Sequence, residues 1–440
     1  MSFKTLKLSQ KLLNTIEKLG YTTPSEIQTK AIPLLLKRKD ILATSQTGTG
    51  KTAAFVFPIL ENLKETTEVK RGDERYKIQA LILAPTRELV LQIHNKTEEY
   101  GASFSHKSVA LYGGIKLGSQ VSAIRAGANI AVATTGRLLE HIKNKTINLS
   151  EVEIIVLDEA DKMLEMGFID DIRKIMLSIP KERHSLMFSA TFPKPIMSLA
   201  KSFLKHPITI EVDKENLSTK QVHQVVNYVN EEDKTPLLAH LIRSNDWHQV
   251  LVFTNTKLQA DKIVEALNTG KLKASAIHGD KSQGMRIEAL KNFKAKKIRV
   301  LVATDVAARG IDILNLPHVI NFELPLQNED YIHRIGRTGR AGQKGEALSL
   351  VCKKEVAQLK EIEELINKKL ELKTTEGFEY EPHTKVSNRK SKKADKKNGV
   401  SLKKAKELAE KMMGKKEMRD EMGSKKGKPT GQKPTNKRHF

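Results

Sequence analysis

Short runs of apolar and β-branched residues alternate with helical patterns along most of this 440-residue chain. Such alternation is typical of parallel sheets built from strand–helix–strand units. The runs fall into two series: 41–44, 80–83, 108–111, 130–133, 154–157 and 185–188, then 250–253, 275–277, 300–303, 319–322 and 347–350. We therefore predict an α/β protein with two tandem domains, each a mainly parallel sheet flanked by helices.

The boundaries of these domains follow from where the pattern stops. A polar stretch at 213–220 separates the two series and is interpreted as a linker, so the domains span 1–212 and 221–375. Beyond them Lys, Asn, Ser and Gly dominate. A segment of that composition buries too little apolar surface to order itself. We expect 376–440 to be a basic, mostly disordered tail.

The charge of the chain is strongly positive and unevenly spread. The sequence holds 76 Lys and Arg against 52 Asp and Glu, a net charge of +24. Residues 383–440 carry 20 basic and 6 acidic residues, a local charge of +14. This balance indicates a polyanionic partner, nucleic acid first. The alternatives for the tail are a solubilising role or a protein-docking arm.

Cysteine content and hydropathy indicate the compartment. The single cysteine, Cys352, excludes an internal disulfide and fits a reducing environment. The first ten residues contain no apolar run of signal-peptide length. Since no apolar stretch approaches the roughly 18 residues of a membrane span, we expect a soluble, cytoplasmic protein.

A phosphate-binding loop is predicted directly after the run 41–44. A strand, a Gly-containing loop and a Lys-Thr pair that opens a helix form the anion cradle of nucleoside triphosphatases. The Lys51 ammonium can reach the β- and γ-phosphates, and the Thr52 hydroxyl can bind Mg²⁺. The alternative is a Gly-rich turn that opens a surface helix. The loop comprises Ser45, Gln46, Thr47, Gly48, Thr49, Gly50, Lys51 and Thr52, with Ser45 where the usual pattern begins with glycine.

An acidic segment follows the buried run 154–157. Asp158 stands where a carboxylate can hold the Mg²⁺ that Thr52 also contacts, and the Glu159 carboxylate can orient an attacking water. An ordinary acidic cap on the next helix is the alternative. Two phosphate-chemistry segments in one domain favour the catalytic interpretation.

The sequence Asp-Glu-Ala-Asp at 158–161 resembles the name-giving box of the DEAD-box ATP-dependent RNA helicases, and the resemblance extends from residue 3 to about residue 370. It implies two RecA-like domains, ATP and Mg²⁺ as cofactors, and RNA as the partner of a monomeric enzyme. The compact core and basic tail are most similar to the bacterial RhlE-type branch.

The resemblance also implies roles around ATP. Residues 20–28 are similar to the adenine-binding Q motif, with Tyr21 to stack on the base, Gln28 to pair with it, and Phe3 as the upstream aromatic. The second domain would add Asp312 at the ribose and Arg337 and Arg340 at the γ-phosphate. His333 would link to Asp161, Ser189 and Thr191 between the domains. The implied catalytic set is Lys51, Asp158, Glu159, His333, Arg337 and Arg340.

Contacts to RNA are implied at further strand ends. Small residues and backbone N–H groups suit phosphate and 2′-hydroxyl contacts, which position a strand without reading its sequence. The implied residues are Pro85, Thr86, Arg87, Gly113, Gly114, Thr134, Gly136, Arg137, Thr254, Asn255, Gln283, Arg286, Thr304 and Asp305. Thr135 replaces the proline of the family's Thr-Pro-Gly-Arg pattern, so we expect a looser loop there.

We conclude from the sequence that the chain couples ATP binding and hydrolysis to single-stranded RNA clamping and local unwinding of short duplexes. An RNA-binding scaffold that ATP merely clamps is the first alternative, and a DNA helicase is the second. Strand displacement distinguishes the scaffold from the helicase.

Overall fold

Two parallel sheets organise the protein. The computed structural model describes residues 2–44, 49–63, 77–212, 222–308, 313, 315–339 and 345–378. We call 2–212 the first half and 222–378 the second half. The first sheet consists of β1 (Ile41–Thr44), β2 (Ala80–Leu83), β3 (Ser108–Leu111), β4 (Ile130–Ala133), β5 (Ile154–Leu157), β6 (His184–Ser189) and β7 (Ile208–Glu211). The second consists of β8 (Val222–Tyr228), β9 (Val250–Thr254), β10 (Ala274–Ile277), β11 (Val300–Thr304), β12 (His318–Asn321), β13 (Gly345–Val351) and β14 (Glu371–Leu372).

The two sheets repeat one topology. The strand order is β3-β4-β2-β5-β6-β1-β7 in the first sheet and β10-β11-β9-β12-β13-β8-β14 in the second, so adding seven to each number converts one order into the other. All the neighbouring strands pair in parallel. Because all these pairs are parallel, the carboxyl ends of the strands in each sheet lie along one edge, which is where open α/β sheets bind ligands.

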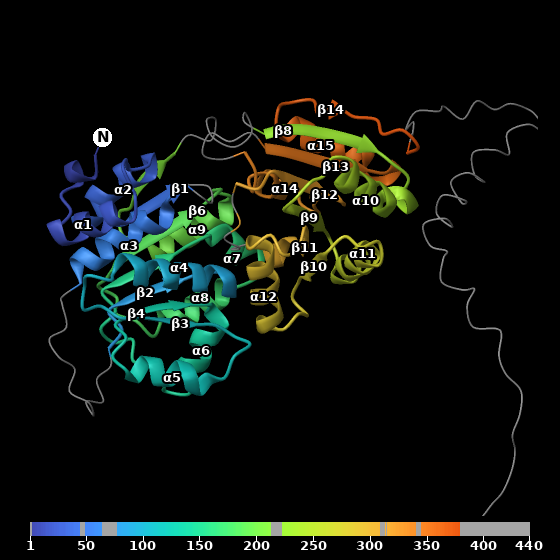
Figure 1. Cartoon of the computed structure of the whole chain (residues 1–440). Coiled ribbons are helices and arrows are strands. Elements are labelled where there is room, and N and C mark those ends of the chain that lie inside the picture. Colours follow the sequence, from blue (N-terminus) through green and yellow to red (C-terminus); the bar gives the residue numbers. More distant parts are fainter. Residues whose placement is uncertain are drawn as a thin grey trace, which may run out of the picture. The chain divides into compact units, whose positions relative to one another are not determined.

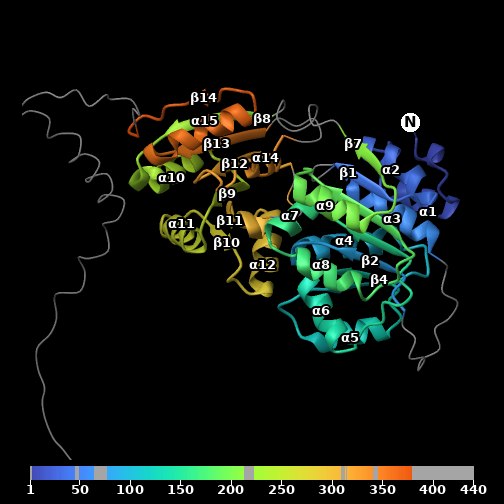
Figure 2. The same cartoon turned by 180° about the vertical axis from the view of Figure 1, so that it is seen from behind.

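Helices cover both faces of each sheet (Figure 1 and, from behind, Figure 2). In the first half, α1 to α4 pack on one face and α5 to α9 on the other. Their bounds are α1 Gln10–Lys18, α2 Glu26–Leu36, α3 Lys51–Asn62, α4 Arg87–Tyr100, α5 Leu117–Arg125, α6 Thr135–Lys143, α7 Ala160–Glu165, α8 Ile169–Met176 and α9 Lys194–Phe203. A short 3₁₀ turn, Phe3–Leu6, precedes α1.

The second half has the same layered construction. Helices α10 and α11 share one core with the sheet, and α12 to α15 pack on its other face. Their bounds are α10 Lys234–Ser244, α11 Lys257–Thr269, α12 Gln283–Lys294, α13 Asp305–Ala308, α14 Asp330–Ile335 and α15 Val356–Leu365. Two further 3₁₀ turns span Glu231–Asp233 and Lys353–Glu355.

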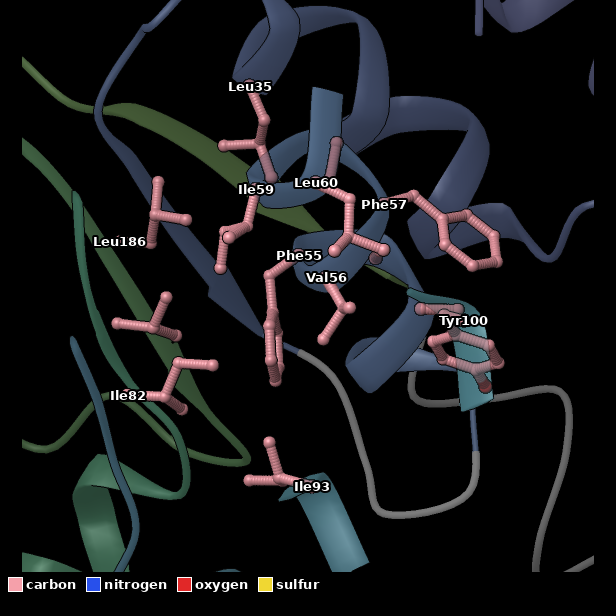
Figure 3. Close-up of a cluster of buried hydrophobic side chains, with 14 of the residues drawn as sticks. Leu35, Phe55, Val56, Phe57, Ile59, Leu60, Ile82, Ile93, Tyr100 and Leu186 are labelled. Atoms are coloured by element: carbon pink, nitrogen blue, oxygen red, sulfur yellow. The ribbon is translucent and has the colours of Figure 1, made fainter. Parts of the chain in front are cut away.

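Successive strand residues feed opposite cores, because side chains alternate across a sheet and both faces are covered. Ile41 and Ala43 belong to the core under α1 to α4, whereas Leu42 belongs to the core under α5 to α9. Phe55 points from α3 toward the sheet (Figure 3). Its ring packs on that of Phe188 of β6, with ring centroids 5.4 Å apart. This packing holds α3, the helix that begins at Lys51, firmly against the strand ends.

Capping residues set where several of these helices begin. The hydroxyls of Ser9, Thr86, Thr256 and Ser282 each accept a hydrogen bond from the backbone N–H three residues later. Such caps satisfy backbone donors that an α-helix leaves unpaired in its first turn. The start of α4 directly after β2 is thereby fixed at Arg87.

The prediction of two helix-flanked parallel sheets is confirmed. Each of the eleven predicted runs corresponds to a strand, although Phe322 of the run 319–322 lies just beyond β12, while β7, β8 and β14 were not predicted. The β8 strand includes the polar residues His223, Gln224 and Asn227, and β14 has two residues, so neither shows a continuous apolar run. The linker 213–220 and residues 379–440 of the tail lie outside the described residues. Within the described ranges no helix is long and apolar enough to cross a membrane.

Candidate active site

A lysine and an aspartate meet at the carboxyl edge of the first sheet. Helix α3 begins at Lys51, and Asp158 follows the last residue of β5. The Lys51 Nζ lies 3.8 Å from Asp158 Oδ1, and the two side chains are 6% and 3% exposed. Burial raises the pKa of Asp158 to about 6, against the lowering effect of the Lys51 charge. The pair thus places one cation and one proton-sensitive carboxylate where β5 ends.

Glu159 occupies a strained backbone position. Its φ is +55°, a left-handed conformation that non-glycine residues rarely adopt. It serves as the N-cap of α7, its N–H donates to Asp158 Oδ1 (3.1 Å), and its side chain is buried. Strain of this kind persists where the surroundings over-determine the conformation, commonly at functional sites. The conformation fixes the direction in which the Glu159 carboxylate leaves the end of β5.

Asp161 connects the acidic segment to the end of β6. Its Oδ2 accepts hydrogen bonds from the backbone N–H groups of Ala190 (3.0 Å) and Thr191 (3.2 Å). The Ser189 hydroxyl donates to the Thr191 carbonyl (2.7 Å) and closes the same turn. The structure therefore brings together Asp161, Ser189 and Thr191, which the sequence analysis assigned to coupling between the domains.

Residues of the second half complete a small polar cavity. Its volume is about 20 Å³, room for roughly one water molecule. His333 and Arg337 line it from the second half, and Lys51, Glu159, Asp161, Lys162 and Ala190 line it from the first. Burial and then the Lys162 charge lower the pKa of His333 to about 4, so the imidazole is neutral at pH 7. Four of the six predicted catalytic residues border this one cavity.

Gln28 contacts the start of α3. Its Oε1 accepts from the Ser25 N–H (2.9 Å), and its Nε2 donates to the Gly50 carbonyl (3.1 Å). Gly50 has a φ of +92°, and a Cβ there would lie 2.5 Å from Gln28 Nε2, so this approach requires glycine. One N–H and one lone pair of the amide remain to bind a base. The same amide is hydrogen-bonded to the backbone of the phosphate loop at Gly50.

The two aromatic residues predicted around adenine have different settings. The Tyr21 hydroxyl lies 3.0 Å from that of Tyr100, and the two rings pack edge to face. Phe3 is 4% exposed and packs edge to face on Phe57 of α3. The buried position of Phe3 favours a role in supporting α3 over direct contact with a base.

A larger groove of about 450 Å³ lies beside the ends of β2, β3 and β4. Most of the RNA residues predicted in the first half border it. The lining residues are Pro85, Thr86, Arg87, Glu88, Gly113, Thr134, Thr135, Gly136, Arg137, Glu140, Met166, Phe168, Gly279, Arg286 and Val306. Met166, Phe168 and Val306 were not predicted, because their apolar side chains carry no polar signature.

Two arginines shape this groove. Arg87 lies so close to Gly114, whose φ is +88°, that a side chain at Gly114 would collide with the guanidinium. Arg137 donates to the Ile115 carbonyl (2.8 Å) and lies 3.4 Å from Glu140. Thr135 is 1% exposed as the first residue of α6, so this described segment is tightly packed where we expected a looser loop.

Gln283 and Arg286 contact the first half of the protein. Gln283 Nε2 donates to Glu88 Oε1 (3.1 Å), and Arg286 Nη2 lies 2.7 Å from Glu88 Oε2. All three side chains are buried. Gln283 and Arg286 were predicted to contact RNA, and Glu88 had no predicted role. Their positions favour coupling of the two halves beside the groove, and the carboxylate of Glu88, directly after the predicted RNA residues 85–87, was the available signal.

A buried arginine organises the strand ends of the second half. Arg334 binds both carboxylate oxygens of Asp305 (2.7 and 2.6 Å) and the side-chain oxygen of Asn255 (3.0 Å). Glu323 accepts from the Thr254 hydroxyl (2.5 Å) and the Asn255 N–H (2.7 Å). These predicted RNA residues therefore direct their side chains to protein partners, which leaves backbone groups for any strand that binds there.

The remaining predicted residues are Ser45, Gln46, Thr47, Gly48, Asp312 and Arg340, which lie outside the described residues. Thr49 and Thr52 flank Gly50 and Lys51 at the start of α3, and Thr304 is the last residue of β11. The donor set fits Mg²⁺. Thr52 is the second residue of α3 and Asp158 directly follows β5, and a carboxylate with a hydroxyl and substrate phosphates is a usual environment for this ion. No cluster of three or more His, Cys, Asp or Glu ligands occurs among the described side chains, so the fit depends on phosphate oxygens.

Comparisons with known proteins identify the family. Residues 25–199 match the model of the DEAD/DEAH box helicase family, and residues 233–342 match the helicase conserved C-terminal domain. The chain is 42% identical over 370 residues to the DEAD-box ATP-dependent RNA helicase CshA of Geobacillus kaustophilus, covering 84% of this chain and 78% of CshA. The chain belongs to the DEAD-box RNA helicase family.

Further relatives and solved structures agree. The chain is 42% identical over 371 residues to the DEAD-box ATP-dependent RNA helicase RhpA of Helicobacter pylori, covering 84% of this chain and 74% of RhpA. Dbp5 of S. cerevisiae, solved with RNA and ADP BeF3, aligns with a TM-score of 0.77 and 29% identity over 94% of this chain and 100% of that chain. Mss116 bound to ssRNA and UDP-BeF aligns with a TM-score of 0.76 and 28% identity, over 86% of this chain and 80% of the Mss116 chain. The similarity to the RhlE-type branch stays a prediction.

Proposed function

We propose that this protein is an ATP-dependent RNA helicase that couples ATP binding and hydrolysis to RNA clamping and local unwinding of short RNA duplexes. The observation that carries the proposal is the cavity in which Lys51 and Glu159 of the first half meet His333 and Arg337 of the second. A water or a phosphate oxygen held there would contact residues of both halves. Membership of the DEAD-box family and likeness to relatives solved with RNA and nucleotide support it.

Each residue has a chemical task in this proposal. Lys51 contacts the β- and γ-phosphates, and Glu159 orients a water and accepts its proton as the water oxygen attacks the γ-phosphorus. The bond to the β-bridging oxygen breaks, giving ADP and phosphate. Arg337, with Arg340, neutralises charge that develops on the γ-phosphoryl oxygens, an effect worth on the order of 10³ to 10⁵ in rate.

Thr52 and Asp158 would hold Mg²⁺, and the ion would supply charge neutralisation between the β- and γ-phosphates. Burial raises the pKa of Asp158, and a bound cation would favour its ionised carboxylate. Gln28 and Tyr21 would recognise adenine, and Asp312 the ribose.

RNA would bind along the groove of about 450 Å³. Its polar lining, rich in small residues and arginine, suits a phosphate backbone and reads no base sequence. The basic tail 376–440 would add RNA or protein contacts. In this proposal the enzyme is a cytoplasmic monomer, with 1–212 and 221–375 as RecA-like domains and 213–220 as the linker.

The decisive experiment combines ATP hydrolysis with strand displacement, using Glu159→Gln as the variant. Glutamine keeps the size of the side chain but cannot accept a proton, so we expect kcat with saturating RNA to fall by about 10² to 10⁴. ATP and RNA binding should persist, and RNA should dissociate more slowly while ATP is present.

Wild-type protein should displace the strand of a short RNA duplex only with ATP. Near wild-type turnover in Glu159→Gln would remove this carboxylate from the mechanism. ATP hydrolysis without displacement of any RNA strand would favour the clamping scaffold instead, and preference for a DNA duplex would favour a DNA helicase.

A further inference from the structure

A buried ion pair joins the two halves next to the nucleotide cavity. Lys162 Nζ lies 3.0 Å from Asp330 Oδ1, and the two side chains are 6% and 8% exposed. The Lys162 ammonium also contacts Glu165 Oε1 at 2.8 Å. Lys162 lies in α7 of the first half and Asp330 in α14 of the second. Neither residue entered the sequence-based site, although Lys162 directly follows the acidic segment 158–161.

Both partners lie on elements that carry predicted catalytic residues. Helix α7 begins directly after Glu159, and Lys162 is in its first turn. Asp330 is the first residue of α14, and His333 follows three positions later on the same helix face. The chain leaves α14 at Gly336 and reaches Arg337, which lines the cavity. The pair therefore connects the helix behind Glu159 to the helix that delivers His333 and Arg337.

The energetics of such a pair make it suitable for alignment. Two charges removed from water attract strongly, but desolvation offsets most of that gain, whereas an unmatched buried charge is strongly unfavourable. The pair therefore contributes little to the stability of either half alone, and it disfavours any closed arrangement in which the two charges fail to meet. A contact of this kind selects one relative position of α7 and α14.

We propose that Lys162 and Asp330 are positioning residues that align His333 and Arg337 with the nucleotide cavity when the two halves meet. The inference rests on the proposed function, because alignment matters only if the cavity hydrolyses ATP. It differs from the contact of Glu88 with Gln283 and Arg286, which borders the RNA groove. The Lys162–Asp330 pair thus favours the correct closed arrangement next to the small cavity, separately from the contact beside the RNA groove.

The test is a charge swap in the full chain. Lys162→Asp and Asp330→Lys should each lower kcat with saturating ATP and RNA at least tenfold, because like charges then face each other. The affinity for a fluorescent ATP analogue without RNA should change less than threefold, because Gln28, Lys51 and Thr52, the residues proposed for adenine and phosphate binding, all belong to the first half. The double variant Lys162→Asp with Asp330→Lys should recover at least half of the decrease in log kcat that the worse single variant shows.

A matched control reverses an exposed pair, Lys205→Glu with Glu182→Lys. These side chains lie 2.6 Å apart and are 55% and 92% exposed, so reversal should leave kcat within twofold. A second readout measures closure by energy transfer between dyes on Leu177→Cys and Leu258→Cys, which are 88% and 66% exposed, while the native Cys352 is buried. With RNA and a non-hydrolysable ATP analogue, each single variant should show a smaller closed fraction, and the double variant should restore it.

The outcomes separate the two proposals. Wild-type turnover in both correctly folded single variants, or a double variant no better than the worse single one, would overturn the alignment role while the proposed function stands. If the wild-type protein hydrolyses no ATP with any RNA, the proposed function fails. The energy-transfer measurement then still decides whether the pair controls the meeting of the halves.

Discussion

At the scale of single residues, Gln28 shows how one amide can serve both recognition and sensing. Its Nε2 already donates to the Gly50 carbonyl next to Lys51. Any base that engages the remaining N–H and lone pair is thereby connected to the backbone that opens α3. Recognition of the base and the shape of the phosphate loop are coupled through a single side chain.

The Gln28→Ala variant should lose discrimination between nucleotides. Adenine offers one donor and one acceptor that an amide matches, whereas guanine offers two acceptors at the same edge. We expect the wild-type protein to prefer ATP to GTP in RNA-stimulated hydrolysis and the variant to erode this preference about tenfold, the effect of losing a hydrogen-bonded pair worth roughly 1.5 kcal/mol. The exposed Gln10→Ala serves as the control. Equal use of both nucleotides by the wild-type protein would contradict the assignment.

His333 should make stability depend on pH. Its pKa in the folded protein is about 4, below the ordinary value of 6.5, so the unfolded chain binds a proton first as the pH falls. The contribution of the neutral imidazole to stability is complete above about pH 6.5 and is lost progressively toward pH 4. Thermal unfolding from pH 4 to 7 should therefore show a weaker decline in His333→Gln than in the wild-type protein.

Asp158 acts in the opposite direction between pH 4 and 6, because its folded pKa is raised. It is common to both proteins in this comparison, so it cancels from the difference. The exposed His206→Gln is the control and should follow the wild-type curve. Parallel curves for wild type and His333→Gln would indicate that His333 is not held neutral.

At the scale of elements, Arg334 decides how the strand ends of the second half are arranged. Its guanidinium connects the residue after β9, the residue after β11 and Asn321, the last residue of β12. The Arg334 Cζ also lies over the ring of Phe253, 5.1 Å from the ring centroid. Three strand ends that are far apart in the sequence are therefore held in position by one fully buried cation.

Arg334→Met should destabilise the protein by about 3 to 5 kcal/mol, because it leaves the partly buried Asp305 carboxylate without its cation and the Asn321 and Glu323 oxygens without their donor. Urea unfolding followed by circular dichroism measures this. Arg173→Met removes an exposed ion pair on α8, with side chains 68% and 79% exposed, and should change stability by less than about 1 kcal/mol. Similar losses in the two variants would argue against the organising role of Arg334.

The same elements show what could be predicted from the sequence. Local apolar runs predicted the central strands, because their side chains enter cores on both faces and leave a continuous hydrophobic signal. The residues that follow apolar runs predicted that Lys51, Asp158 and Glu159 lie at one edge of the first sheet, because parallel strands deliver their carboxyl ends to the same edge. The role of His333 was implied only by the resemblance to the family. Partners distant in the chain could not be predicted in this way. Nothing local in the sequence indicates that Asp305 faces Arg334 or that Arg286 faces Glu88.

At the scale of the whole molecule, the basic tail should control affinity for RNA more than chemistry. Residues 383–440 carry a local charge of +14. Each phosphate that the tail neutralises steepens the log–log dependence of binding on salt by about 0.7 on a single strand. Removal of 383–440 should weaken RNA binding at low salt and flatten this slope, while ATP hydrolysis without RNA stays nearly unchanged.

RNA affinity measured from about 50 to 300 mM salt for both proteins tests this. Unwinding should suffer most at limiting RNA, because a tethered basic segment raises the effective concentration of RNA at the core. If the full chain and the truncated chain show the same RNA affinity and the same salt dependence, the tail does not bind RNA and serves solubility or protein docking.

The repetition of one strand order in both sheets has a consequence for how the protein works as a machine. The chain resembles a dimer whose two subunits are joined covalently, because its two halves share one strand order. The halves carry different site residues: Lys51 and Glu159 lie in the first half, and His333 and Arg337 in the second. Covalent tethering supplies an effective concentration on the millimolar scale for short connections. Weak, reversible contacts are then sufficient for assembly, and each catalytic cycle can end in dissociation of the halves without loss of either partner.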